Sequence, residues 1–201
     1  MAETFPQLLA RIRACRICEA HLPLGPRPVV QASLHARLLI VSQAPGRKVH
    51  ATGIPFNDPS GERLRDWLGI DKTVFYDAGK IAIVPMGFCF PGSGKGGDLP
   101  PRPECAPQWH PLLLPRMKQV QLTLAIGQYA QAGLLGAARG KTLTATVQDW
   151  RTHLHVRGIL PLPHPSPRNR LWLARNPWFE IELLPELRRQ VARVLGIAAA
   201  G

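Results

Sequence analysis

The stretch R-L-L-I-V-S-Q-A-P-G, residues 37–46, passes from a continuous apolar segment into a loop that contains proline and glycine. Three further short apolar segments, at residues 81–84, 121–126 and 158–162, end in the same way. Strands that are apolar throughout are typical of a parallel sheet buried on both faces. The sequence therefore predicts an α/β fold with three layers, α/β/α, around a central parallel sheet of about four strands.

Helical patterns separate these strands, and we expect helices over residues 5–13, 60–68, 107–114, 128–135 and 177–195. The second has the clearest boundaries, because Asp58 can cap it, Pro59 suits its first position and Gly69 follows its end. The segment P-G-S-G-K-G-G-D-L-P-P-R-P, residues 91–103, is expected to form an irregular loop. A length of 201 residues suits one core, so we predict a single domain over residues 1–201.

The chain is strongly basic, with 25 Lys and Arg against 13 Asp and Glu and a net charge of +12. This balance favours a polyanionic partner, above all nucleic acid. No apolar run approaches the roughly 18 residues of a membrane span, so we expect no membrane contact. The start M-A-E-T-F-P-Q lacks the basic and apolar parts of a secretory signal, and we therefore expect a cytoplasmic protein, acting as a monomer.

The four cysteines of the chain are Cys15 and Cys18, in C-R-I-C, and the more distant Cys89 and Cys105. Two ligands on one tight turn and two brought in by the fold can form one metal site. A zinc ribbon would repeat C-x2-C, whereas fifteen residues separate Cys89 from Cys105, so an iron–sulfur cluster rivals zinc. Independent buried thiols and disulfides are the alternatives, and a reducing compartment disfavours the latter.

Functional groups in parallel sheets collect at the carboxyl ends of the strands. The loops S-Q-A-P-G (42–46), T-G-I-P-F (52–56) and H-P-S-P-R-N (164–169) occur there or directly after. Together they resemble the motifs of the uracil-DNA glycosylase superfamily. The last two are most similar to its single-strand-selective monofunctional branch, and the four cysteines to its iron–sulfur branch, family 4. The resemblance extends from Cys15 to about Asn176.

The resemblance implies a DNA-repair enzyme that takes a base out of the stack into a pocket. Phe56 would stack on this base, and His164 would stabilise the negative charge that grows on it as the glycosidic bond breaks. The wall around the base would come from Ala44, Pro45 and Gly46. Contacts to DNA are expected from Ser166, Arg168, Asn169 and Lys95.

Two positions depart from the family pattern. Gln43 stands where the iron–sulfur branch has an acid, and an amide can position water but cannot accept a proton at neutral pH. Asp58 is the acid that could complete the site, although it also suits a helix cap. Residues 85–87 offer no side-chain amide where the family reads uracil with Asn.

Two hypotheses follow from these departures. The first is a DNA glycosylase for uracil or another deaminated base, with a [4Fe–4S] cluster or, alternatively, zinc. The second is a superfamily member that binds DNA but has weak activity or none.

Overall fold

The computed structural model of the protein describes residues 3–198. Its centre is a parallel sheet in the order β2-β1-β5-β6, and its strands are β1 (Leu38–Val41), β2 (Ile81–Ile83), β5 (Leu122–Ile126) and β6 (Ile159–Leu162). Leu39 of β1 lies opposite Ala82 of β2 and Thr123 of β5. The predicted α/β class, the parallel sheet and the positions of its strands are confirmed.

The helices are α1 (Phe5–Arg13), α2 (Arg47–Thr52), α3 (Pro59–Leu68), α4 (Lys72–Phe75), α5 (Cys105–Leu113), α6 (Gly127–Leu135), α7 (Leu143–Gln148), α8 (Trp150–Arg157), α9 (Arg170–Arg175) and α10 (Leu184–Leu195). All five predicted helices are present, and the last begins as a π-helical turn at Phe179–Leu183. The helices α2, α4, α7, α8 and α9 were not predicted. These helices span four to eight residues, which is too short for a clear apolar periodicity.

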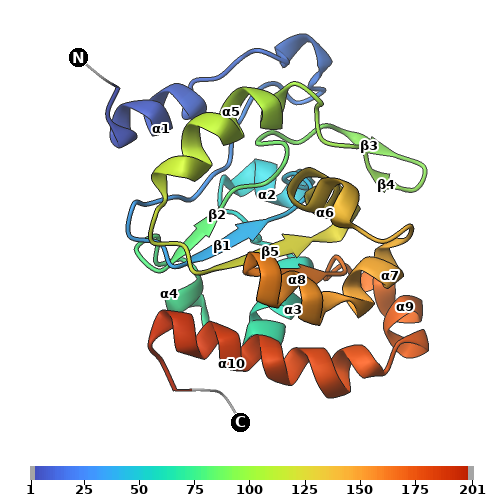
Figure 1. Ribbon diagram of the computed structural model, residues 1–201. Helices are drawn as coiled ribbons and strands as arrows, with labels where there is room; N and C mark the ends of the chain where they lie inside the picture. The colour runs from blue at the N-terminus through green and yellow to red at the C-terminus, as the bar shows by residue number, and fades with distance from the viewer. Residues whose placement is uncertain (1–2, 199–201) are drawn as a thin grey trace.

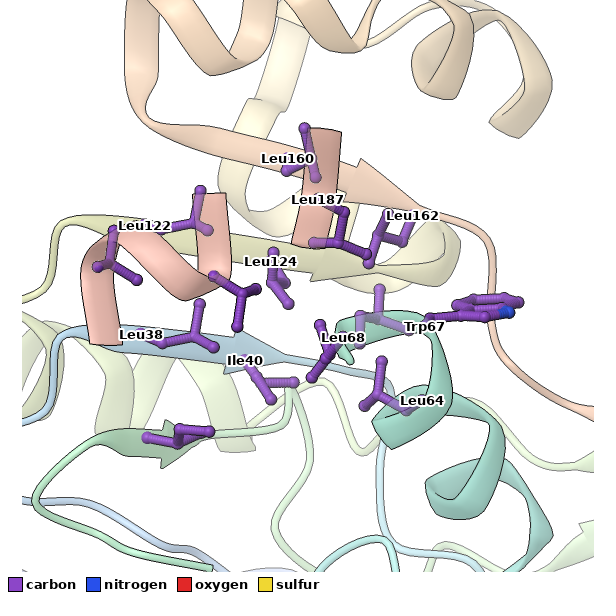
Figure 2. Close-up of a cluster of buried hydrophobic side chains, with 14 of the residues drawn as sticks. Leu38, Ile40, Leu64, Trp67, Leu68, Leu122, Leu124, Leu160, Leu162 and Leu187 are labelled. Atoms are coloured by element: carbon purple, nitrogen blue, oxygen red, sulfur yellow. The ribbon is translucent and has the colours of Figure 1, made fainter. Parts of the chain in front are cut away.

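Side chains of β1 alternate between two cores. Leu38 and Ile40 are fully buried on one face, against α3 and α10, where Leu64 and Leu187 meet them. Figure 2 shows this core, with leucines from three strands facing the side chains of α3 and Leu187 of α10. Each fully buried leucine contributes about 1.5–3 kcal/mol through removal of apolar surface from water, so this face supplies much of the stability.

The opposite face of the sheet is covered by α1, α5 and α6. Leu39 and Val41 point to this side, where Ile12 of α1 and Trp109 of α5 are buried. Figure 1 shows α1 and α5 above the sheet and α10 below it. The two cores make the three-layer α/β/α arrangement that continuous apolar strands require.

Local sequence signals explain where α3 begins and ends and why β6 can contain a proline. The Asp58 carboxylate caps α3, Pro59 is its first residue, and Gly69 ends it with a φ of 65°. Pro161 is tolerated in β6 because this strand pairs only with β5 and lies at the sheet edge.

The glycine-rich segment is more regular than expected. Residues 93–98 form a small antiparallel hairpin of β3 (Ser93–Gly94) and β4 (Gly97–Asp98), which corrects the prediction of an irregular loop. Figure 1 shows the hairpin on the side toward which the strand arrows point. No helix within residues 3–198 is both long and apolar enough to cross a bilayer.

Candidate active site

A pocket of about 580 Å³ opens at the carboxyl ends of the strands. This volume lies within the range of small-molecule sites. Its walls come from the loop after β1, the end of β2, the start of α6, the loop after β6 and the β3–β4 hairpin. Among its lining residues are Gln43, Ala44, Pro45, Gly46, Phe56, Asp58, Pro85, Asp98, Gln128, His164, Ser166, Arg168 and Asn169. Most of the predicted site residues are therefore brought together.

Phe56 is held in an unusual backbone conformation beside the pocket. Its φ is 54°, and no other non-glycine residue among those described has a positive φ. Such a conformation costs about 1–3 kcal/mol and persists only where the surroundings enforce it. Here the ring is buried edge-on against Phe75, with 6.1 Å between ring centroids, and Gly61 leaves room for the Phe56 carbonyl. The fold therefore fixes the conformation of Phe56, which is one of the residues that line the pocket.

Asp58 uses its two oxygens differently. Oδ1 accepts a 2.8 Å hydrogen bond from the backbone N–H of Gly61 and so caps α3. Oδ2 lies 4.0 Å from the position that a Cβ would take at Gly46, in the pocket wall. A cap and a pocket carboxylate are thus compatible in one side chain, because each role uses a separate oxygen.

Gln43 is hydrogen-bonded to the residue that follows β4 of the hairpin. Its Nε2 donates a 3.0 Å hydrogen bond to the carbonyl oxygen of Leu99. The backbone of the same loop is fixed by bonds from Met86 N–H to the Ser42 carbonyl and from Gly87 N–H to the Gln43 carbonyl. The bond to Leu99 leaves Oε1 as the end of the amide that can hold a water molecule.

His164 is half-buried in the pocket wall. Burial lowers its pKa below the ordinary 6.5, while the carboxylates of Asp58 and Asp98 act in the opposite direction. The burial effect is the larger, so the imidazole is neutral at neutral pH. A neutral ring can donate one N–H to an oxygen without carrying a charge of its own.

The loop that carries His164 is braced by hydrogen bonds. Asn169 Nδ2 donates to the His164 carbonyl at 2.7 Å, and Ser166 Oγ accepts from the Arg168 N–H at 3.2 Å. Arg63 of α3 donates to the Ser166 carbonyl at 3.1 Å. Ser166 and Asn169 therefore shape the loop as well as lining the pocket.

Arg168 and Lys95 lie near the mouth of the pocket. Arg168 donates to the Gly96 carbonyl of the hairpin at 2.9 Å, so one of its nitrogens is already used within the protein. Lys95 lies in the turn of the same hairpin and is exposed. Arg168 and Gly96, the neighbour of Lys95, both line the pocket.

The four cysteines line a second, smaller pocket. Burial raises the pKa of Cys89 to about 11 and that of Cys105 to about 12, and the neighbouring cysteines add to both shifts. The Phe88 N–H opposes the shift of Cys105 by donating to its Sγ at 3.3 Å. Within the described part of the chain, no three His, Cys, Asp or Glu side chains converge closely enough to hold a single metal ion.

The pocket residues that sequence reasoning missed include Asp98 and Gln128. Gln128 lies at the start of α6, directly after β5, so its place at a strand end was a usable signal. Asp98 had no such signal, because it lies in the glycine-rich segment and enters the pocket only through the hairpin. Gln128 supplies a side-chain amide in a pocket where residues 85–87 have none.

The family model of the uracil DNA glycosylase superfamily matches residues 29–188. This range contains the sheet, every pocket residue named above, and Cys89 and Cys105, while Cys15 and Cys18 precede it. Since the match covers most of the chain, the protein belongs to the uracil-DNA glycosylase superfamily.

Proposed function

We propose that the protein is a DNA-repair glycosylase that hydrolyses the N-glycosidic bond of uracil or another deaminated base in DNA. Membership of the superfamily supports a DNA glycosylase-type function in general. The observation that carries the finer proposal is the shared pocket: Phe56, His164 and Gln43 all line it, at the carboxyl edge of the sheet. One cavity thus combines a stacking face, a neutral donor and a water-holding amide.

Substrate binding begins with the extrusion of a base, which costs a few kcal/mol in lost stacking and pairing. Phe56 offers a replacement stacking surface, and its enforced backbone means that little further ordering is needed on binding. The loop from Ala44 to Gly46 forms the adjoining wall. Gln128 provides an amide that can bond to the edge of the base.

Bond cleavage moves negative charge onto the base and positive charge onto the sugar. His164, kept neutral by burial, donates a hydrogen bond to the base oxygen where negative charge develops. Gln43 positions the attacking water through Oε1, and the Asp58 carboxylate stabilises the sugar cation. Single-turnover excision by Asp58→Asn tests the last role, which an unchanged rate would remove.

DNA binding is supported by the charge of +12 and by Lys95 and Arg168 beside the pocket mouth. Ser166 and Asn169 hold the loop that presents Arg168. Phosphate contacts of this kind make affinity fall steeply as salt rises. A gel shift with duplex and single-stranded oligonucleotides over a salt series measures this dependence.

A [4Fe–4S] cluster is the cofactor that we propose for Cys15, Cys18, Cys89 and Cys105. The four soft sulfur donors share one pocket, which suits such a cluster. Zinc, which four thiolates can also bind in a structural site, is the alternative. The cluster would be structural, because hydrolysis transfers no electrons, and it would join the segment after α1 to both ends of the loop that bears the hairpin.

The alternative function is DNA binding without catalysis, which the amide of Gln43 in place of an acid favours. Anaerobically purified protein would be incubated with oligonucleotides, single- and double-stranded, that carry one uracil, hypoxanthine or xanthine. Alkali-labile abasic product from any of them supports the glycosylase and names its substrate. A salt-dependent gel shift without product supports the alternative.

A further inference from the structure

Asp98 brings a second carboxylate to the pocket, from the β3–β4 hairpin. Its Oδ2 lies 3.1 Å from the position that a Cβ would take at Gly46, and Oδ2 of Asp58 lies 4.0 Å from the same point. Both carboxylates also act on the charge of His164. An acid that is distant from Gln43 in the sequence is therefore folded against the loop that carries Gln43.

The hairpin leaves this carboxylate available for chemistry. Ser93 Oγ donates to Oδ1 of Asp98 at 2.9 Å, across the register in which Ser93 pairs with Asp98. Among the described residues no Lys, Arg or His forms an ion pair with Asp98, since the nearby Arg168 bonds instead to the Gly96 carbonyl. Oδ2 therefore faces the pocket wall with its negative charge uncompensated by an ion pair.

Gln43 connects directly to the residue after Asp98. Its Nε2 donates to the Leu99 carbonyl at 3.0 Å, so the amide helps to hold the strand on which the carboxylate lies. In Asp58, by contrast, one oxygen is already committed to the cap of α3. Gln43 is thus bonded to the residue that follows Asp98, and both side chains belong to residues that line the pocket.

We propose that Asp98 is a catalytic residue of the glycosylase reaction, the base that accepts a proton from the attacking water. In this step the bond between C1′ and the base nitrogen breaks, and its electron pair leaves with the base. The water oxygen bonds to C1′, and one of its protons moves to Oδ2 of Asp98. That proton then passes through solvent to the departing base, so that the products are the free base and an abasic sugar.

The inference rests on the proposed glycosylase function and accounts for Gln43 within it. If the Asp98 carboxylate accepts the proton, no acid is needed at position 43, because the hairpin supplies the proton acceptor. Gln43 then has two tasks, holding the hairpin through Nε2 and orienting water through Oε1. The carboxylate is supplied by a segment that the β1 loop motif does not include.

The test is single-turnover excision by Asp98→Asn, with DNA affinity measured on the same oligonucleotide. We expect the rate to fall by about 100-fold or more, the usual contribution of a general base. We expect affinity to stay equal or to rise, because a negative charge near the DNA is lost. Asp98→Glu should recover part of the rate, and Glu180→Gln, which removes an exposed carboxylate elsewhere, should match the wild type.

Three results would overturn the assignment. An Asp98→Asn rate within about threefold of the wild type would remove Asp98 from catalysis and leave the glycosylase function standing. A parallel loss of rate and affinity would show that the residue only supports the hairpin. Absence of product from the wild type would remove the proposed function itself, and the role of Asp98 with it.

Discussion

Nη1 of Arg168 donates a 2.9 Å hydrogen bond to the carbonyl oxygen of Gly96 and thereby ties the loop that carries His164 to the hairpin that carries Asp98. The two segments are far apart in the sequence, and each supplies part of the pocket wall. The contact depends on a glycine at position 97, where φ is 131° and a Cβ would overlap Arg168 Nη1. The pocket is therefore closed on this side by one arginine and one glycine.

Gly97→Ala should separate these two walls. We expect the single-turnover rate of base excision to fall by at least about tenfold, because displacement of a site wall by about 1 Å can cost up to 10²-fold. The melting temperature should change little, since the hairpin is largely exposed. Gly96→Ala is the matched control, because a Cβ there has no atom within 4 Å. Equal excision rates for the two variants would contradict this role of the contact between Arg168 and the hairpin.

Gly61→Ala should displace the backbone of Phe56. A Cβ at position 61 would overlap the Phe56 carbonyl oxygen, and backbone cannot move aside as a side-chain end can. We expect a loss of about 2–3 kcal/mol in the free energy of unfolding, measured with urea, together with weaker excision.

The control for this substitution is Gly133→Ala, in α6. There the new methyl group meets only the end of the Met86 side chain, and alanine is favoured in a helix by about 1 kcal/mol. This variant should be as stable as the wild type or more so. If Gly61→Ala were as stable as Gly133→Ala, the close approach of Gly61 to the Phe56 carbonyl would not limit the residue at position 61.

The cysteine pocket leads to an analytical prediction. Protein purified without oxygen should contain iron and acid-labile sulfide in equal amounts, and Cys15→Ser should lower both together with the melting temperature. The loss of stability follows because the cluster would join the segment after α1 to α5. Stoichiometric zinc without sulfide, or a Cys15→Ser variant with unchanged metal and stability, would contradict the cluster assignment.

Burial of His164 makes the stability of the protein depend on pH. The pKa of His164 in the fold lies below the ordinary 6.5, so on acidification the unfolded chain binds this proton first. The protonation of His164 therefore does not affect the free energy of unfolding well above pH 6.5, and it lowers this free energy as pH falls below that value.

We therefore expect the free energy of unfolding to drop between about pH 7.5 and about pH 5.5, and to drop less in His164→Gln. Urea unfolding at the two pH values measures the difference. His155→Gln, which changes an exposed histidine on α8, should behave as the wild type does. An identical drop in His164→Gln and the wild type would show that His164 is not the source.

The sequence predicted the parts of this structure that depend on local pattern. The four strands, the long helices and the cap of α3 by Asp58 follow from apolar runs and from capping preferences, which act over a few residues. The motifs around Phe56 and His164 also lie at the strand ends where they were expected.

What could not be predicted depends on contacts between distant segments. The β3–β4 hairpin is held by Arg168 and Gln43 from other loops, so its glycine-rich sequence alone indicates only a loop. Asp98 enters the pocket through that hairpin, and the positive φ of Phe56 is enforced by its packing. The short helices α7 and α8 are likewise stabilised by the buried Val147 and Trp150 rather than by their own pattern.

The most direct test of the central claim is the single-turnover rate of base release by the wild type and by His164→Ala, with the affinity for the same DNA measured in parallel. Our account expects free base and abasic sites from the wild type. In His164→Ala the rate should fall by about 10²-fold or more, the usual cost of a lost oxyanion donor, while affinity changes little. Tight, salt-dependent binding with no release of base by the wild type, or an undiminished rate in His164→Ala, would contradict it.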